Sequence, residues 1–540
     1  APSPAARGVI WAGSDDGRIH VTRDGGATWS SVEGNLPGAP AGAWVPHIEA
    51  SAFDAAEAYV VLDDHRRSNW TPYVYKTADY GKTWTSLVTP ALRGWALVVE
   101  QDPVKRELLF LGTEFGLYVS VDGGREWLPW RHGVPTVSVM DLAIHPTEHD
   151  LVIGTHGRSA LVIDDIRPLR ELDAAALAEP LHVFAAADAR QFWRDAEAGG
   201  FGLGDGEFRG ENKPYGAILT YSLNLPDLPL PDAEKEKARQ AAVRAEAAKG
   251  KAWEPSPNPP KADAGQPAKP DEPPQVEIRI TDAAGKPVRV FKGPAVRGLN
   301  RAVWDFRRDG FREPAQRGGR RRSGEPAPGP ELPPGVYTAT VTFRDQNAAT
   351  TFTVWPDPRS ANSPADWARR QAAIERIGRL QETAAAAVDQ LADARADVET
   401  VMERVRAAEI RRLKAERVEP EEGKLAELPL VKNGRALKTR LEEMERRFHQ
   451  PPGTVGIVGG VRVMERIGKA MGAVTSSWAP PSPSHEAYIT EAERLLAPAL
   501  EALNALMAGE VAAFRRAVAQ ADIVLLPPPQ PLAMPAPEGR

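Results

Sequence analysis

The feature that most constrains this chain is a short phrase that occurs three times in its first quarter. In each copy an Asp can accept the N–H groups of a turn, a Gly can adopt positive φ, and a Trp can pack over the turn. The phrase therefore predicts three hairpins closed by the same chemistry. The copies are Thr22-Arg-Asp24-Gly-Gly26-Ala-Thr28-Trp29, Thr77-Ala-Asp79-Tyr-Gly81-Lys-Thr83-Trp84 and Ser120-Val-Asp122-Gly-Gly124-Arg-Glu126-Trp127.

The spacing of the copies matches the size of one structural repeat. The closing tryptophans follow one another at intervals of 55 and 43 residues, close to the roughly 40 to 50 residues of a four-stranded propeller blade. A second repeated spacing supports this size. Asp16 and Glu114 stand eight positions before Asp24 and Asp122, and His156 stands eight positions before Asp164, where the repeated phrase is incomplete. We expect a partial β-propeller in residues 1–172, with about four blades. The blades are expected at 8–32, 46–88, 94–130 and 137–170.

The three copies resemble Asp-boxes, or BNR repeats, of the sialidase and sortilin-type β-propellers. Residues 1 to about 170 resemble the last blades of such a ring. Tyr73-Val-Tyr-Lys76-Thr-Ala-Asp79 together with Gly154-Thr-His-Gly-Arg158 resembles, more narrowly, large exported bacterial proteins that are labelled glycosyl hydrolases or sortilin-like. The resemblance implies export to the periplasm or the outside of the cell. It also implies a structural role for the box residues.

Four blades, of which the first lacks an opening strand, are too few to close the ring of such a protein. The missing blades are expected from an upstream segment of the same gene product or from a partner chain. Because the chain begins Ala1-Pro2-Ser3, without Met, we expect a fragment or a processed product.

Composition narrows the remaining classes. The chain has 540 residues, several times a typical domain of roughly 150. Its 67 Lys and Arg against 73 Asp and Glu, a net charge of −6, argue against a nucleic-acid binder. The absence of Cys excludes disulfides and thiolate metal sites. No uninterrupted apolar run approaches the roughly 18 residues of a transmembrane helix, so no transmembrane segment is expected. We also expect no cofactor and no metal ion.

The middle of the chain reads as a second β-rich module. Residues 173–213 lose periodicity and are expected to be a connector, and residues 214–357 show period-two strands typical of a β-sandwich. Pro333-Pro-Gly-Val-Tyr337 resembles the Ig-like or fibronectin-like module of the same exported proteins. Residues 225–275 are Pro-, Lys- and Glu-rich, which predicts a disordered insertion. Seven arginines between Arg307 and Arg322 leave open an anion site or a solvated loop.

The C-terminal part changes to helical periodicity. Ser363-Pro364-Ala-Asp366 is a start signal for a long helix ending near 416. Further helices are expected at 433–449 and 484–520, so residues 363–520 are predicted to form an antiparallel bundle. Residues 453–460 resemble a phosphate-binding loop only in their glycine content. They lack its Gly-Lys-Ser/Thr sequence, so we interpret them as a connector. Residues 521–540 are a Pro-rich tail.

The turns between second and third strands define the candidate ligand face, opposite the Asp-boxes. The turn of the second blade is the most suggestive, because Trp70 and Tyr73 flank its charged residues and could stack on a sugar or clamp a peptide. The alternative is a surface turn held by internal salt bridges. A metal site of His145, His149 and His156 is disfavoured, since two of these precede the strand. The predicted ligand-binding residues are Asp16, Asp63, Asp64, His65, Arg66, Trp70, Glu114, His156 and Arg158.

Two functions remain open. The first is a non-catalytic recognition or scaffold protein that binds peptide or glycan on the propeller face. The alternative is a glycoside hydrolase, which needs two carboxylates about 5 to 9 Å apart. Asp63 or Asp64 with Glu114 is the candidate catalytic pair. A sialidase is disfavoured because its Phe-Arg-Ile-Pro signature is absent.

Overall fold

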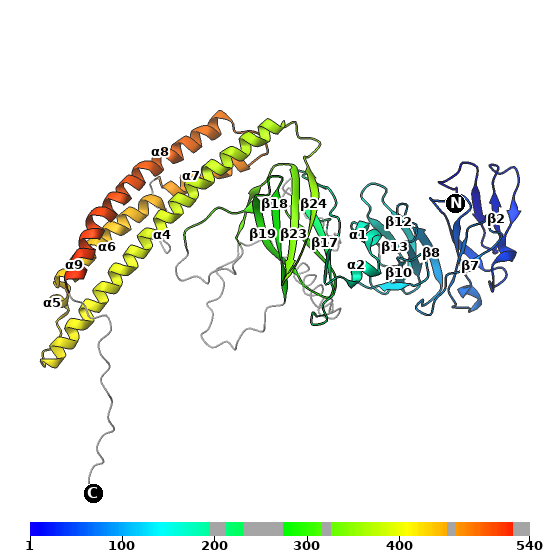
Figure 1. Ribbon diagram of the computed structural model, residues 1–540, viewed down its shortest axis with the longest axis horizontal. Helices are drawn as coiled ribbons and strands as arrows, with labels where there is room; N and C mark the ends of the chain where they lie inside the picture. The colour runs from blue at the N-terminus through cyan, green and yellow to red at the C-terminus, as the bar shows by residue number, and fades with distance from the viewer. Residues whose placement is uncertain (194–211, 230–273, 316–325, 451–460, 522–540) are drawn as a thin grey trace, which may run out of the picture.

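The computed structural model describes residues 1–193, 212–229, 274–315, 326–450 and 461–521. Three parts follow one another in Figure 1: small antiparallel sheets at the N-terminal end, a pair of larger sheets, and long helices. The chain is thus mainly β with a C-terminal helical region, as the sequence predicted. Most of the expected insertion, the glycines of 453–460, Arg317–Arg322 and nearly all of the tail lie outside the described residues.

The first part consists of four sheets, which we call blades one to four. Each is an antiparallel meander in which consecutive strands are hydrogen-bonded neighbours. Blade one holds β1 (Ile10–Gly13), β2 (Ile19–Thr22) and β3 (Ser30–Ser31); blade two β4 (Trp44–Ala50), β5 (Ala58–Asp63), β6 (Tyr73–Thr77) and β7 (Thr85–Ser86); blade three β8 (Ala96–Gln101), β9 (Leu109–Thr113), β10 (Gly116–Ser120) and β11 (Leu128–Trp130); blade four β12 (Val139–Ile144), β13 (Leu151–Thr155) and β14 (Ala160–Ile163).

The blades are held together by side chains that alternate between their two faces. On β9, Leu109 and Leu111 pack toward blade two in one cluster with Tyr59. Phe110, between them in the sequence, packs toward blade four in another cluster with Ile153. All of these side chains are fully buried. An inner blade therefore needs apolar residues at successive positions, which explains the near-continuous apolar runs of its strands.

The three repeated turns share one hydrogen-bond pattern. In the first, Asp24 Oδ1 accepts the backbone N–H of Thr28 at 2.9 Å, and Thr22 Oγ1 accepts that of Gly26 at 2.9 Å. Asp79 and Asp122 accept the equivalent N–H groups at 2.9 and 3.0 Å. Hydrogen bonds from the hydroxyl and the N–H of Thr28 lower the pKa of Asp24 to about 2. The expected hairpin chemistry is thus present in each copy.

The first and last blades differ from the two inner ones. Each has three strands, and in blade one Pro2 forms a single bridge to Ile10 where the inner blades have an opening strand. Trp84 and Trp127 are buried between blades, whereas Trp29 of blade one is 44% exposed. The closing Trp is therefore buried only where a preceding blade lies beside it.

The middle part packs two sheets around one core. One sheet has the order β15-β17-β20 and the other β16-β24-β23-β18-β19, with β21 and β22 paired separately. Tyr221 from the first sheet and Ile278 and Val341 from the second are fully buried together. The strands are β15 (Leu181–Val183), β16 (Ala189–Arg190), β17 (Ala217–Leu223), β18 (Gln275–Asp282), β19 (Pro287–Pro294), β20 (Gly298–Trp304), β21 (Arg307–Asp309), β22 (Pro328–Glu331), β23 (Gly335–Phe343) and β24 (Gln346–Trp355).

The boundaries of the middle part differ from those expected from the sequence. β15 and β16 lie within residues 173–213, which we expected to be a connector, and each adds a strand to one sheet. Leu228 lies within the expected insertion, yet it is buried in the shared core. Both segments were too short for their periodicity to show in the sequence.

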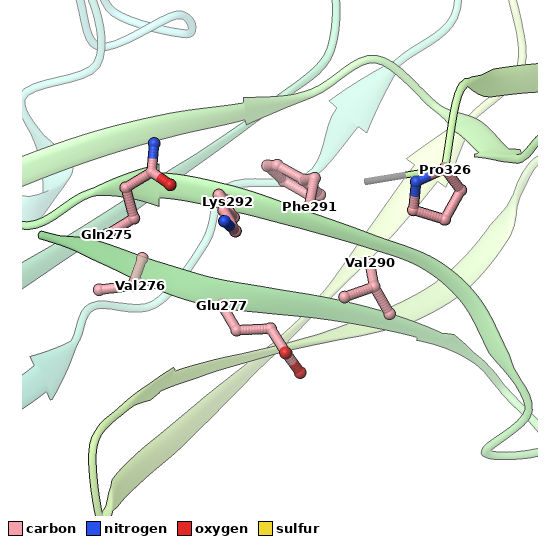
Figure 2. A pocket seen from close by; sticks show the side chains of 7 residues that line it. All are labelled: Gln275, Val276, Glu277, Val290, Phe291, Lys292 and Pro326. Carbon is pink, nitrogen blue, oxygen red and sulfur yellow. The ribbon is translucent and has the colours of Figure 1, made fainter. Parts of the chain in front are cut away.

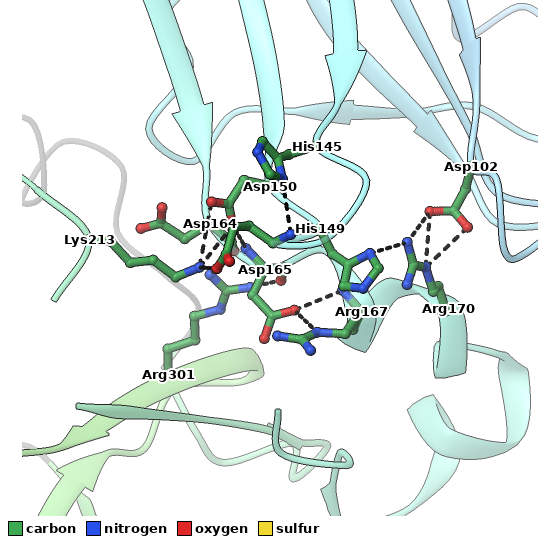
Figure 3. Close-up of polar contacts among 11 residues, drawn as sticks. Asp102, His145, His149, Asp150, Asp164, Asp165, Arg167, Arg170, Lys213 and Arg301 are labelled. Atoms are coloured by element: carbon green, nitrogen blue, oxygen red, sulfur yellow. Dashed lines mark hydrogen bonds and ion pairs between the residues drawn. The ribbon is translucent and has the colours of Figure 1, made fainter. Parts of the chain in front are cut away.

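A polar joint connects blade four to the middle part (Figure 3). Arg301 of β20 donates to the backbone oxygens of Asp164 and Asp165, both at 2.6 Å. Lys213 pairs with Asp150 at 3.1 Å. Arg170, on α1 (Arg167–Glu171), pairs with the fully buried Asp102 of blade three. α2 (Ala174–Ala178) follows α1 directly.

A shallow hollow of about 180 Å³ lies on the hairpin of β18 and β19 (Figure 2). Val290, Phe291 and Pro326 give it an apolar lining, and Glu277 and Lys292 lie at its rim. Glu277 is the single acid among its lining residues. The hollow therefore offers no pair of carboxylates for hydrolysis.

The C-terminal part is a helical region whose helices share one apolar core, and we refer to it as the bundle. Its longest helix begins as predicted, because Ser363 caps it and Pro364 occupies the first turn. The described residues also contain α5 and α7, which the sequence did not predict. The helices are α4 (Pro364–Ala415), α5 (Glu422–Ala426), α6 (Pro429–Phe448), α7 (Val463–Thr475), α8 (Pro483–Leu506), a π turn (Met507–Val511) and α9 (Ala512–Gln520).

Two arginines of the Arg-rich run join the middle part to the bundle. Arg308 pairs with Glu375 and Arg312 with Asp389, both acids being on α4. Phe311 between them packs against the bundle core. The described beginning of the Arg-rich run therefore packs against α4.

One of the described helices, Pro483–Gln520, is long and apolar enough to cross a membrane by length and composition alone. The expectation of no transmembrane segment rests on the absence of an uninterrupted apolar run, and this helix carries charged residues along its length. Glu501 and Glu510 are among the charged residues that interrupt it, yet its most apolar 18 residues have a mean hydropathy of 1.3. Ile489 and Leu503 of this helix are buried in the bundle, and 22% of its most apolar stretch is buried. A core helix of a soluble protein passes the same test.

Candidate recognition site

The turns between second and third strands lie beside the starts of the opening strands. The N–H of Glu114 donates to the backbone oxygen of Trp95 at 3.2 Å, and that of His156 to Ser138 at 2.9 Å. In blade two, Trp44 pairs with Asp63 across β4 and β5. These turns and the connections between blades therefore share one face, which we call the loop face.

Asp63 holds the histidine of the blade-two turn. Nδ1 of His65 lies 2.7 Å from each carboxylate oxygen of Asp63, which also accepts the backbone N–H of His65 at 2.9 Å. The Asp63 side chain is 1% exposed. A buried carboxylate needs a donor, so Nδ1 carries the proton and Nε2 is left for other contacts.

Asp64 holds the rest of the same turn. Its carboxylate pairs with Arg67 and accepts from Asn69 Nδ2 at 2.9 Å. Asn69 also donates to the hydroxyl of Tyr73, and Arg67 donates to the backbone oxygen of Ala41 in the preceding connection. Asp63 and Asp64 are thus used inside the turn, and neither offers a free carboxylate to pair with Glu114.

Aromatic rings stack over this turn. The rings of His65 and Trp95 are 4.6 Å apart and inclined by 16°, and those of Trp70 and Trp95 are 5.2 Å apart. Arg66 lies 4.9 Å over the ring of Trp44. Trp70 nevertheless remains 57% exposed. An exposed indole that is held by its neighbours is a ready contact surface for a ligand.

The other predicted residues lie farther along the loop face. Asp16 is exposed, and its pKa is lowered, chiefly by a hydrogen bond from Ser14. Glu114 is half-buried beside the exposed Phe115. His156 and Arg158 are exposed on blade four. Within the described part of the chain, no ion pair, hydrogen bond or ring contact joins any of these four to the side chains of the blade-two turn.

Two acids that the sequence analysis missed lie on the opening strands. Burial raises the pKa of Glu49 on β4 to about 7, and burial together with the charge of Glu49 raises that of Glu100 on β8 to about 8. Burial also lowers the pKa of His47, on the same strand as Glu49. The signal was the repeated spacing Trp44 to Glu49 and Trp95 to Glu100.

Within the described ranges, no group of three or more His, Asp or Glu side chains is placed to hold a metal ion. His145 accepts the backbone N–H of Glu148 through Nδ1, and His149 contacts Arg170. His156 lies on the loop face. The structure therefore does not gather these three histidines into one site.

The strand order and the blade packing place residues 1–172 in the β-propeller class. No protein-family model matches the chain. A 109-residue segment is 35% identical to the vacuolar protein sorting/targeting protein 10 of Laccaria bicolor, and the match covers 19% of this chain and 7% of that protein.

Solved structures give partial matches. They include YCF48 bound to D1 peptide (18% identity, 30% of this chain and 49% of that chain, TM-score 0.24) and the GH74 enzyme of Niastella koreensis (20%, 30% and 27%, 0.26). The GH74 xyloglucanase from Xanthomonas campestris matches at 14% identity over 65% of this chain and 42% of that chain, with a TM-score of 0.25. The matched part is less than half the length of each of these relatives.

Proposed function

We propose that the chain is a non-catalytic recognition protein that binds peptide or glycan on the loop face of its propeller part. One observation carries the proposal: Trp70 is 57% exposed, yet its ring packs on Trp95, which in turn stacks on His65. A surface turn that served only to join two strands would not need three stacked rings. The rings lie on the face where propeller turns and blade connections meet.

The geometry favours recognition over hydrolysis. A glycosidase of this type needs two carboxylates that flank the scissile bond. Asp63 is committed to His65, and Asp64 to Arg67 and Asn69. Glu114 therefore has no free partner from the blade-two turn.

We also propose that further blades, from an upstream segment or a partner chain, complete the propeller. Phe110 and Val119 of blade three are buried against blade four, whereas Val152 and Val162, which pair in the same way on β13 and β14, are 37% and 56% exposed. These valines leave an apolar strip where the next blade would pack.

Three finer assignments belong to the same proposal. The repeated turns would be Asp-boxes of the sialidase and sortilin type, and the middle part an Ig-like module. In that module the hydroxyl of Tyr337 donates to the backbone oxygen of Pro333 at 2.6 Å, as in a tyrosine corner. The protein would be exported, which the local similarity to a sorting protein supports.

The proposal is tested with peptide and glycan arrays probed by the full chain. Trp70→Ala should weaken every specific ligand at least tenfold. Trp29→Ala is the matched control, because Trp29 is also exposed but belongs to a repeated turn. The proposal would be overturned if ligands bound Trp70→Ala and Trp29→Ala equally, or if neither array contained a ligand. Cleavage of array glycans that is lost in Glu114→Gln would establish the hydrolase instead.

A further inference from the structure

The blade-two turn presents an exposed indole, Trp70, that two neighbouring rings hold in place. Trp95 lies 5.2 Å from the ring of Trp70, and His65 lies 6.4 Å from it at an inclination of 28°. The indole is thus braced where it meets these rings and open over the rest of its surface. A braced ring loses little freedom on binding, so contact with it contributes more to affinity.

His65 supplies the polar half of the same surface. Its Nδ1 is committed to Asp63, so Nε2 is the ring atom left to bond a ligand, and the side chain is 31% exposed. In the neutral ring this atom accepts a hydrogen bond. Arg66, exposed in the same turn, adds N–H donors. The turn therefore offers a flat apolar area on Trp70, an acceptor on His65 and N–H donors on Arg66, which lies over Trp44.

The charges of the turn select among ligands. Asp63 and Asp64 are buried and paired, while Arg66, and Arg93 in the connection before Trp95, are exposed. Lys and Arg side chains would otherwise stack well on an exposed indole, and the exposed arginines of this turn and of the neighbouring connection disfavour a cationic ligand by like-charge repulsion. A neutral or acidic ligand avoids that repulsion.

From this combination we propose that the ligand is a carbohydrate, one of whose pyranose rings stacks its C–H face on Trp70 while a hydroxyl donates to His65 Nε2. The proposal rests on the recognition function proposed above and narrows it to one ligand class. A pyranose ring has an apolar C–H face with hydroxyl groups around its edge, and it carries no positive charge unless it bears a free amine. A peptide segment would need an extended groove, and the described contacts of this turn form a compact platform.

The test is isothermal titration of the full chain with neutral gluco-, xylo- and manno-oligosaccharides, with galacturonate oligosaccharides, and with an array-derived peptide set. At least one saccharide series should bind, and Trp70→Ala should weaken it tenfold or more. Trp70→Phe should retain part of the affinity, because a smaller ring still stacks. Asp63→Asn should weaken binding less than Trp70→Ala, by altering the hydrogen bond that orients His65. Circular dichroism checks that each variant is folded.

The outcomes separate this inference from the function on which it rests. Peptides that bind through Trp70, with no saccharide bound, would refute the carbohydrate assignment and leave recognition standing. Saccharides that bind equally to Trp70→Ala would refute the placement on this turn. No ligand of either class dependent on Trp70 would overturn both.

Discussion

Gly81 of the second repeated turn packs directly against Val32, which follows the outer strand of blade one. A Cβ atom at Gly81 would lie 2.9 Å from Cβ of Val32, and the residue has φ of +80°. Gly124 stands in the same relation to Leu87 of blade two, again at 2.9 Å. These glycines therefore serve two purposes, since they allow the turn and they let the blades approach.

This relationship predicts different costs for one substitution at equivalent positions. Gly26 has φ of +100°, but its nearest contact for an added Cβ is Trp29 at 3.8 Å. Gly26→Ala should therefore incur the backbone strain alone, whereas Gly81→Ala adds a clash and should destabilise by about 1–3 kcal/mol more. Urea denaturation of the full chain, followed by tryptophan fluorescence, measures the difference. Equal losses would show that the blade contact relaxes freely.

The ion pair of Asp102 and Arg170 predicts a second large effect. Arg170 donates to Asp102 from Nε at 3.0 Å and Nη2 at 2.9 Å, and Asp102 is fully buried. Arg170→Ala would leave a buried charge unpaired, so we expect a loss of about 3–5 kcal/mol in the free energy of unfolding. Asp102→Leu together with Arg170→Met should recover part of it. Arg412→Ala, at an exposed pair with Glu409, should leave the midpoint of denaturation unchanged.

The acids of the opening strands predict a dependence of stability on pH. Burial raises the pKa of Glu49 to about 7 and of Glu100 to about 8, whereas an unfolded Glu titrates near 4.3. The folded protein therefore binds more protons than the unfolded chain between these values. Their contribution to stability is full below about pH 4 and is lost as pH rises toward 8.

Glu100→Gln tests the direction of this pH dependence, because the amide side chain is uncharged at every pH. The variant should gain stability over the wild type as pH rises from 5 to 8.5, measured as the difference in Tm. Glu126→Gln, at an exposed position on a repeated turn, is the control and should show a constant difference. A constant difference for Glu100→Gln as well would refute a buried protonated acid.

The sequence predicted those parts of the fold whose signals are local. The repeated turns are visible because Asp24, Gly26 and Trp29 recur with their mutual spacing preserved. The long helix is visible because Ser363 and Asp366 form a capping box. These features depend on hydrogen bonds within a few residues, so the chain alone specifies them.

The features that the sequence did not predict depend on distant contacts. α7 contains Gly468 and Gly472, which lower its helix propensity, and packing of Ile467 in the bundle core compensates. Trp95 lies in a different blade from His65, so their stacking follows only from the blade arrangement. Trp70 and His65 stand out as candidate ligand contacts from the composition of their turn, but the rings that hold them in place could not be predicted from it.

The joint between the middle part and the bundle supplies a last prediction, at a glycine within α4. Alanine in place of glycine normally stabilises a helix by about 1 kcal/mol. At Gly378 we expect the opposite, because Phe311 packs onto that position and a Cβ atom would overlap its ring. Arg308 holds Phe311 there through a contact of 4.1 Å with its ring and a pair with Glu375, one turn before Gly378.

Gly468 in α7 is the matched control, because a Cβ atom there meets no other atom within 4 Å. Gly468→Ala should raise the Tm, whereas Gly378→Ala should lower it. Gly378→Ala should also speed trypsin cleavage after Arg307, Arg308 and Arg312, because the segment around Phe311 would no longer pack on α4. If Gly378→Ala also raised the Tm, Phe311 would have to move aside without loss. The packing of Phe311 on α4 would then contribute little to stability, and polar contacts such as Arg308 with Glu375 and Trp478 with Glu331 would hold the two parts together.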